Sequence, residues 1–352
     1  MRWSLLLLLA CTRLPPSEVE PEREGGVTAT WSTPAEDTSL QTVAAFDRDF
    51  LPAALEAIDG ARAEVRVAQF LLTDASPVDQ LLASLARAAG RGVRVRVLAD
   101  EEGEDTDRVI RNLALDGVEA KLDSPRVMTH NKLVIADDVV VVGSHNWTSS
   151  ALGRNHEASL RLADAEVSGW YAAWFDAVWD APEVDPELSA WQRTDLVPLA
   201  GRDVTPALLD CLDGASEVIE LAMYCWLWDD RYPGSDVDLV LTAVEDAHAR
   251  GVEVRVLLDD SSWVRTNAIN DDAIARLHAA GIDVWRSPTD VTMHAKVLRC
   301  DERLIVSDAN WTYSGLEVVH GTSVLVTEPE LVEAAEAWLA ELRAAARVEL
   351  AP

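Results

Sequence analysis

Short runs of consecutive apolar residues alternate along this chain with longer segments in which apolar residues recur every three or four positions. The short runs have the length and β-branched content of buried strands, whereas the longer segments have the spacing of helices packed on one face. Before the first long segment, Ser76 is expected to cap the helix and Pro77 to occupy its first turn. The pattern predicts strands at 64–72, 93–99 and 155–163, a two-stranded hairpin at 130–144, and helices at 80–92, 108–117 and 166–179.

The same order of elements occurs a second time. Residues 59–71 resemble 213–226, residues 86–100 resemble 247–260, and residues 143–153 resemble 307–317. A repeat of roughly 150 residues has the size of a domain rather than of a solenoid unit. We therefore expect an α/β protein of two tandem domains related by a pseudo-twofold axis, each a mixed, largely parallel sheet flanked by helices. Because 190–204 lacks clear periodicity, the domains are placed at 39–195 and 196–352.

The first 38 residues differ from the rest of the chain. A basic residue and a short apolar run that ends in Leu-Leu-Ala-Cys resemble a bacterial lipoprotein signal at 1–10, with Cys11 lipidated and 11–38 as a flexible tether. This predicts a lipoprotein secreted across the inner membrane, in the periplasm or at the cell surface, and bound to the membrane by its N-terminal lipid. A plain signal peptide and a misassigned start are the alternatives.

Composition adds two constraints. The 30 Lys and Arg against 61 Asp and Glu give a net charge of −31, which disfavours nucleic acid as a partner without excluding it. Cys211, Cys225 and Cys300 are expected to be buried thiols, with a Cys211–Cys225 disulfide as the alternative. No Cys or His spacing typical of zinc is present, so we expect neither metal nor cofactor, and a monomer.

Both copies of the repeat carry the same pair of polar residues. His130 and Lys132 stand two positions apart at the start of a predicted strand, so their side chains share one face. His294 and Lys296 repeat this arrangement 164 residues later. Each half therefore presents an imidazole beside an ammonium group.

Two further pairs accompany this motif at matching positions. Asp137 and Asp301 fall in the predicted hairpin turns, where we expect them to fix local structure rather than to touch a substrate. Asn146 and Asn310 follow the next strand and are expected to return an amide donor to the same pocket. A lysine and an asparagine that converge on one point suit an oxyanion such as a phosphate oxygen.

Two facing half-sites suit displacement at phosphorus. The attacking group and the leaving group lie roughly opposite each other, so one histidine attacks while the other protonates the leaving oxygen. A single His-x-Lys is common and usually means only a solvated histidine. Two copies, each 16 residues before an Asn-Trp-Thr inside a whole-domain repeat, favour catalysis.

The twofold occurrence of His-x-Lys-x4-Asp resembles the signature of the phospholipase D superfamily, over about residues 40–345. The resemblance implies phosphodiester cleavage through a phosphohistidine, transfer to water or an alcohol, and no required metal. It implies that His130 is the nucleophile and His294 the general acid. It also implies that Ser144 binds phosphate and that Glu157, as an acid bonded to the catalytic imidazole, supports His130.

The second copy departs from this pattern. Asp308 stands where a small hydroxyl is common, and it would weaken phosphate binding if it points inward. Gly321 stands at the place of Glu157, which leaves open whether the second half-site is damaged or whether Glu317 or His320 substitutes.

Four more residues are candidates for the rim of the pocket. Asp100 and Asp259 end equivalent strands and are expected either to border the site or to cap the next helix. Trp147 and Trp311 follow the two asparagines and are candidates to line the pocket.

These features predict a phosphodiesterase of phospholipase D type, a hydrolase that acts on a phospholipid head group or another phosphodiester. The alternatives are a metal-independent endonuclease of the same superfamily, a phosphatidyltransferase similar to cardiolipin synthase, and an inactive binding homologue. A nuclease should show a basic groove, and the arginines near the two motifs are few: Arg126, Arg154, Arg299 and Arg303.

Overall fold

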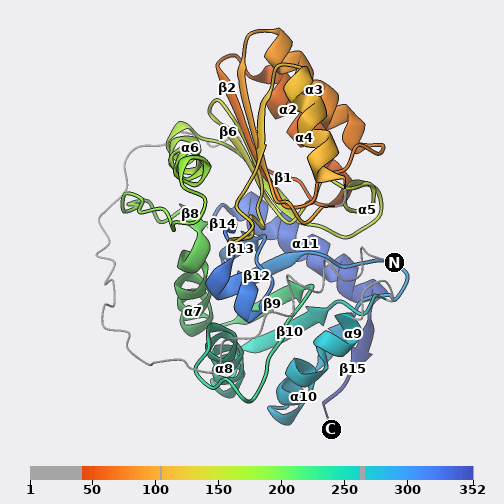
Figure 1. Cartoon of the computed structure of the whole chain (residues 1–352). Helices are drawn as coiled ribbons and strands as arrows, with labels where there is room; N and C mark the ends of the chain where they lie inside the picture. Colours follow the sequence, from red (N-terminus) through yellow and green to blue (C-terminus); the bar gives the residue numbers. More distant parts are fainter. Residues whose placement is uncertain (1–41, 104, 262–265, 352) are drawn as a thin grey trace.

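The structure is a computed structural model that describes residues 42–103, 105–261 and 266–351 (Figure 1). The expected signal at 1–10, Cys11 and the tether at 11–38 all lie outside the described residues. Across the described ranges, none of the helices has both the length and the apolar character that a membrane crossing requires.

The first half is built on a seven-stranded sheet with the order β1-β7-β6-β5-β2-β3-β4. Only the pairs β2–β3 and β3–β4 are parallel, and the other neighbours are antiparallel. The strands are β1 (Val43–Ala44), β2 (Glu64–Gln69), β3 (Arg94–Ala99), β4 (Glu119–Leu122), β5 (Lys132–Ala136), β6 (Val139–Gly143) and β7 (Ser159–Ala163).

Helices cover both faces of this sheet (Figure 1). On one face lie α2 (Phe50–Gly60), α3 (Val78–Gly90) and α4 (Thr106–Leu115), and on the other lies α6 (Ala165–Asp180). Two short elements, η1 (Asp47–Asp49) and α5 (Ser149–Gly153), complete the half.

The second half repeats this plan with eight strands in the order β15-β11-β10-β9-β12-β13-β14-β8. Parallel pairing is again confined to three strands, β9, β10 and β11. The strands are β8 (Leu196–Ala200), β9 (Val218–Met223), β10 (Glu253–Leu258), β11 (Val284–Arg286), β12 (Lys296–Cys300), β13 (Arg303–Ser307), β14 (Thr322–Val326) and β15 (Arg347–Glu349).

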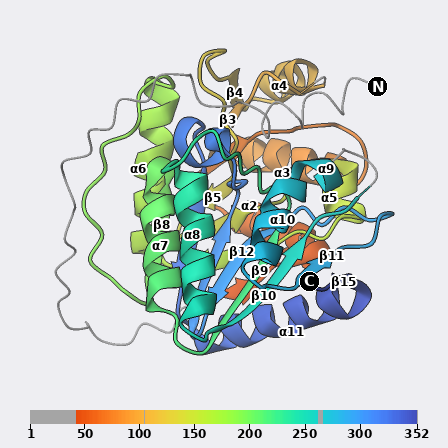
Figure 2. The same cartoon turned by 90° about the horizontal axis from the view of Figure 1, so that it is seen from below.

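The helices of the second half are placed in the same way. Figure 2 shows α7 (Val204–Gly214) and α8 (Asp236–Ala249) side by side, with α11 (Pro329–Ala345) on a different side of the sheet. The remaining elements are η2 (Gly201–Asp203), α9 (Thr266–Ile269), α10 (Asp271–Ala279) and η3 (Ser314–Val318).

The predicted fold class is confirmed, with three corrections. The parallel part of each sheet is smaller than expected, because the hairpin strands add antiparallel neighbours. Ser76 is not a cap: α3 begins at Val78 after Pro77, with no side-chain hydrogen bond at its N-terminus. Pro77 is the N-cap residue rather than part of the first turn of α3. The segment 190–204, which lacks clear periodicity in the sequence, contains β8, which pairs with β14.

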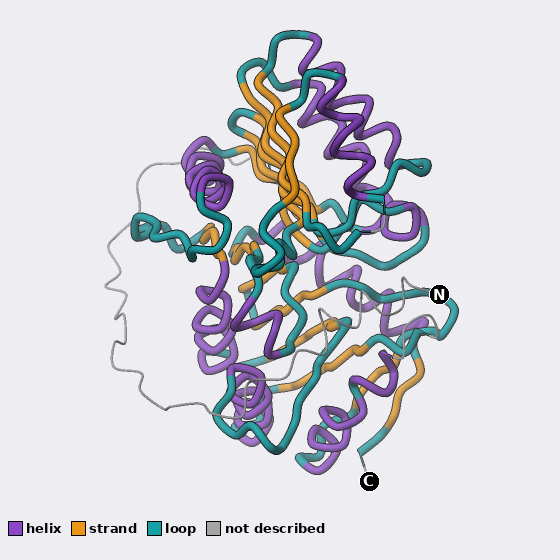
Figure 3. Tube along the Cα trace, viewed as in Figure 1, coloured by secondary structure: helices purple, strands orange, loops and turns teal. Residues whose placement is uncertain are grey.

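One apolar cluster joins the two halves. It combines the inner faces of both sheets, represented by Ile135 and Val142 from the first and Val297 and Val306 from the second, with residues of α6 and α11. Separate clusters lie under the outer helices of each half. Figure 3 shows the two sets of strands meeting in the middle of the molecule with helices outside them. Shared burial of this kind fixes the two sheets relative to each other.

The cysteines differ from the prediction. Cys211 and Cys300 form a disulfide that joins α7 to β12, with their Cα atoms 5.8 Å apart, and Cys225 is a buried thiol outside this disulfide. The expectation that Cys211 and Cys300 stay as thiols is wrong, and so is the alternative pairing with Cys225. The reason is that α7 packs on the strand that carries Cys300, a contact that sequence spacing does not reveal.

Candidate active site

The two histidine segments cross between the halves. The backbone N–H of His130 donates to the carbonyl oxygen of His320 at 2.9 Å, and that of His294 donates to the carbonyl oxygen of His156 at 2.8 Å. Each histidine is therefore held by a residue just before a strand of the opposite half, β14 for His130 and β7 for His294. These contacts lie at the junction of the two sheets. The pseudo-twofold relation expected from the sequence is visible in these matched bonds.

Both histidines and both lysines are brought together in the interior. The exposed fraction is 3% for His130 and His294 and 1% for Lys132 and Lys296. The ammonium group of each lysine donates to the backbone carbonyl of the histidine two positions earlier. Buried cations bonded to backbone oxygens form a rigid positive site, which suits one small anion.

An aromatic ring lies against each histidine, which the sequence reasoning missed. The ring centroids of Phe70 and His130 are 4.8 Å apart, and those of Tyr224 and His294 are 4.6 Å apart. The lysine of each half also lies over the same ring. The signal was present in the repeat, because Phe70 and Tyr224 follow equivalent strands at the same position.

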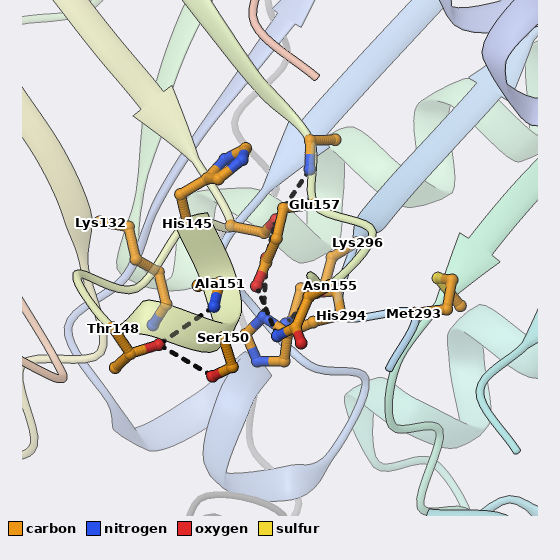
Figure 4. A network of polar contacts seen from close by, with 12 residues as sticks. Lys132, His145, Thr148, Ser150, Ala151, Asn155, Glu157, Met293, His294 and Lys296 are labelled. Atoms are coloured by element: carbon orange, nitrogen blue, oxygen red, sulfur yellow. Dashed lines mark hydrogen bonds and ion pairs between the residues drawn. The ribbon is translucent and has the colours of Figure 1, made fainter. Parts of the chain in front are cut away.

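Glu157 bonds to the histidine of the other half. Its Oε2 lies 2.8 Å from Nδ1 of His294, and both side chains are almost completely buried (Figure 4). The expectation that Glu157 supports His130 is therefore wrong. The carboxylate points across the interface because the segment just before β7, which carries Glu157, pairs with the segment that carries His294.

Ser144 is committed to Glu157 rather than open to a phosphate. Its hydroxyl donates to Glu157 Oε2 at 2.6 Å and accepts from the backbone N–H of Ala158 at 2.9 Å. The only hydroxyl proton is thereby used, which argues against the predicted phosphate-binding role. Asn155 donates to the other carboxylate oxygen of Glu157 at 3.2 Å, so three side chains hold this acid in one orientation.

Burial dominates the electrostatics of the site. It lowers the pKa of His130 and His294 well below the ordinary value, and both lysines act in the same direction. It also lowers the pKa of Lys132 to about 7 and raises the pKa of Glu157. Burial thus disfavours the charged forms of these groups, and a bound anion offsets this because it stabilises the positive charges.

The asparagines and tryptophans predicted for the pocket are buried. Asn146 and Asn310 are buried, with 4% and 2% of their surface exposed, next to the fully buried Trp147 and Trp311. Asp308 is also buried, and its Oδ2 accepts from the backbone N–H of Thr322 at 2.7 Å.

Neither proposed substitute for a missing second carboxylate fits. Glu317 accepts from the backbone N–H of Asp236, and His320 bonds to the carbonyl oxygen of Pro182. These contacts hold both side chains on elements other than the segment of His130.

The aspartates of the two hairpin turns act on the backbone. Asp137 has a positive φ of 49° and accepts from the N–H groups of Arg62, Ala63 and Glu64. Asp301 accepts in the same way from the residues that begin β9. Each carboxylate holds a turn against the start of a central strand, away from the histidines.

Asp100 and Asp259 have a role that neither prediction gave. Asp100 accepts from the backbone N–H of Thr129 at 2.9 Å, and Asp259 accepts from that of Met293 at 2.8 Å. Each aspartate therefore fixes the residue directly before a histidine. Asp123 shares the Thr129 N–H. Burial, with repulsion from Asp123, raises the pKa of Asp100 to about 8, and burial, with repulsion from Glu101, raises that of Asp123 to about 6.

Comparison with known proteins agrees with this architecture. Residues 54–179 and 208–343 each match the family described as "Cardiolipin synthase, PLD-like domain". The mouse protein "Mitochondrial cardiolipin hydrolase" is 34% identical over 98 residues, which is 27% of this chain and 43% of that protein. "Phospholipase D" of Rickettsia bellii is 30% identical over 116 residues, 32% of this chain and 56% of that protein. The chain thus spans about half the length of these curated relatives.

Among solved structures, a phosphatidylserine synthase from Haemophilus influenzae has a similar fold. The TM-score is 0.69 at 11% identity, over 88% of this chain and 87% of that one. The polyphosphate kinase of Porphyromonas gingivalis gives a TM-score of 0.62 at 17% identity, over 86% of this chain and 46% of that one. At these identities the likeness concerns the fold alone.

Proposed function

The chain belongs to the phospholipase D-like family, and on that premise we propose that it is a phosphodiesterase that cleaves phospholipid head groups through a phosphohistidine. In this proposal His130 is the nucleophile and His294 is the general acid. The names of the curated relatives, cardiolipin hydrolase and phospholipase D, support a lipid phosphodiester as substrate.

The observation that carries the proposal is the buried bond between His294 Nδ1 and Glu157 Oε2. A carboxylate at Nδ1 leaves Nε2 to face the substrate and stabilises the protonated imidazole relative to the same buried ring without a carboxylate. A general acid needs this orientation and this support. The bond therefore supports a catalytic role for His294, and we assign protonation to His294 and attack to His130 as the family resemblance implies.

The proposed reaction has two steps. The lone pair of His130 Nε2 attacks phosphorus, the bond from phosphorus to the head-group oxygen breaks, and that oxygen takes the Nε2 proton of His294. In the second step His294 removes a proton from water, the water oxygen attacks phosphorus, and the P–N bond to His130 breaks. Lys132 and Lys296 stabilise the charge on the phosphoryl oxygens in both steps.

The charge around the site disfavours nucleic acid as substrate. Asp100, whose carboxylate holds the segment of His130, is followed directly by Glu101 and Glu102. The whole chain carries a net charge of −31. A polyanion needs several basic contacts along its backbone, while a single lipid phosphate needs only the two buried lysines.

Head-group release from vesicles tests the proposal. The vesicles contain phosphatidylcholine, phosphatidylethanolamine, phosphatidylglycerol and cardiolipin, in EDTA, and His130→Ala serves as the matched control. We expect release by the native protein, none by the variant, and a phosphatidyl group that can be trapped on His130. Equal release by His130→Ala would contradict the proposal, and cleavage of single-stranded DNA but of no lipid would assign the site to a nuclease.

A further inference from the structure

The first half has a carboxylate for the histidine across the interface, and the second half lacks one at the matching position. Residues of the two halves correspond at an offset of 164, so Ser144 matches Asp308 and Glu157 matches Gly321. The pair of Ser144 and Glu157 thus becomes a pair of Asp308 and Gly321. The acid of the second half thus stands directly after β13 (Arg303–Ser307), whereas Glu157 of the first half stands shortly before β7.

Asp308 occupies the place of both side chains of the first half. Its Oδ2 accepts from the backbone N–H of Thr322, as Ser144 Oγ accepts from that of Ala158. A Cβ atom on Gly321 would lie 2.6 Å from Asp308 Oδ1, closer than any side chain tolerates. The second carboxylate oxygen of Asp308 therefore fills the space into which a glutamate at position 321 would extend.

His130 and Asp308 each have a buried polar atom without a hydrogen-bond partner among the described residues. These atoms are Nδ1 of His130 and Oδ1 of Asp308. His130 is 3% exposed and Asp308 is 0% exposed, so water is not a ready substitute. A buried donor and a buried acceptor without partners are costly when they stand apart, which favours their pairing.

Backbone hydrogen bonds place the segment of His130 beside the segment of Gly321, which Asp308 contacts. The N–H of His130 donates to the carbonyl of His320, the neighbour of Gly321, as the N–H of His294 donates to the carbonyl next to Glu157. By the same pseudo-twofold symmetry, His130 pairs with Asp308 of the second half, as His294 pairs with Glu157 of the first half.

We infer that Asp308 is the positioning residue of His130: it accepts a hydrogen bond from Nδ1 and directs Nε2 to the substrate, as Glu157 does for His294. Asp308 thereby replaces the glutamate that Gly321 lacks, and the second half-site is complete. The expected effect on rate rests on the proposed function, whereas the hydrogen bond itself does not.

Transplanting the first-half arrangement tests this inference. Asp308→Ser removes the acid and should lower kcat by about 10- to 100-fold on a lipid phosphodiester, with a smaller change in KM. Asp308→Ser combined with Gly321→Glu recreates Ser144 and Glu157 in the second half and should recover most of the loss. A double variant that melts like the native protein but is as slow as Asp308→Ser would overturn the inference.

A second readout does not depend on activity. Side-chain ¹⁵N spectra of histidine-labelled protein, with the His130 signals assigned by His130→Ala, report which ring nitrogen carries the proton. We expect Nδ1–H in the native protein and in the double variant, and loss of this preference in Asp308→Ser. An unchanged His130 tautomer in Asp308→Ser would refute the role of Asp308, even if the native protein cleaved no phosphodiester at all.

Gly321→Glu alone gives the complementary check. Two carboxylates would then compete for one buried space, so the melting temperature should fall, and Asp308→Ser should restore it. If Gly321→Glu melts at the native temperature, the two positions do not share this space and the inference is wrong.

Discussion

The two halves reach the same geometry with different residues. Lys132 and Lys296 have matched burial and matched backbone bonds, and Phe70 and Tyr224 lie against the two histidines in the same way. Glu157, which precedes β7, bonds to His294, whereas we assign Asp308, which follows β13, to His130. Within the described residues, only the second half has a disulfide. On this assignment the two halves keep the position of a carboxylate and change the residue that supplies it.

The largest expected effect distinguishes the chemical roles of the two histidines, whose surroundings are similar. With bis(p-nitrophenyl) phosphate, whose leaving group needs no proton, His294→Ala should keep most of the native first-step rate. On a lipid substrate the same variant should lose ~10²–10⁴-fold, the usual contribution of a general acid. His130→Ala should be inactive on both substrates because no covalent intermediate forms.

Burst kinetics with the two substrates make this measurement. If His130→Ala is the variant that retains activity on the activated ester, the two roles are reversed. Equal losses for both variants on both substrates would mean that the histidines do not divide attack and protonation between them.

The disulfide gives the next effect, on stability. Its counterparts in the first half are Ala57 and Ala136, at the equivalent helix and strand positions. Replacing Cys211 and Cys300 by alanine should lower the free energy of unfolding by ~2–4 kcal/mol, through the loss of a cross-link in the unfolded chain. Hydrogen exchange should locate the loss in α7 and β12, with Cys225→Ala as the control. An equal loss across both halves would show that they unfold as one unit.

Glu157→Gln sharpens the comparison of the two acids. It keeps the shape of the side chain but removes the charge that supports the protonated His294. We expect kcat on a lipid substrate to fall about 10- to 100-fold and the activated ester to be affected less, because only protonation of the leaving group is impaired. A larger loss on the activated ester would contradict the assignment of Glu157 to the acid.

The smallest effect concerns the acids that hold the histidine segments. Asp100 shares its N–H donor with Asp123, whereas Asp259 has the hydroxyl of Ser287 nearby instead of a second acid. The pKa values of Asp100 and Asp123 are raised to about 8 and about 6, above the ordinary 3.8. The folded state therefore binds protons more tightly than the unfolded state, and stability should fall as the pH rises from about 4 to about 8.

Asp123→Ser copies the second half into the first and tests this. At pH 8 the melting temperature should rise by a few degrees, of the order of 1 kcal/mol, while at pH 5 the two proteins should differ little. Calorimetry at both pH values makes the comparison, with Ser287→Ala as a control that carries no charge. A variant that is less stable than the native protein at pH 8 would show that the Asp123 bond to Thr129 outweighs the repulsion between the acids.

Sequence reasoning reached the repeat, the α/β class and the residues of the two motifs, because these depend on local spacing and on identity within each copy. It gave Glu157 to the wrong histidine, since nothing in the order of residues shows which half a side chain reaches into. The same limit hid the Cys211–Cys300 bond and the commitment of Ser144 to Glu157. It also led Asp308 to be taken as a defect, because the space left by Gly321 appears only when both strands are in place.

The crossed backbone bonds, from His130 to His320 and from His294 to His156, have an evolutionary consequence. A chain with one half alone could form such a site only by meeting a second copy of itself, and every substitution would then appear twice. Covalent fusion of the copies makes assembly independent of concentration and lets each copy drift separately. In two separate copies of one chain, a change from the Ser144 and Glu157 pair to the Asp308 and Gly321 pair would occur in both halves at once. Only a fused chain can carry this change in one half and not in the other.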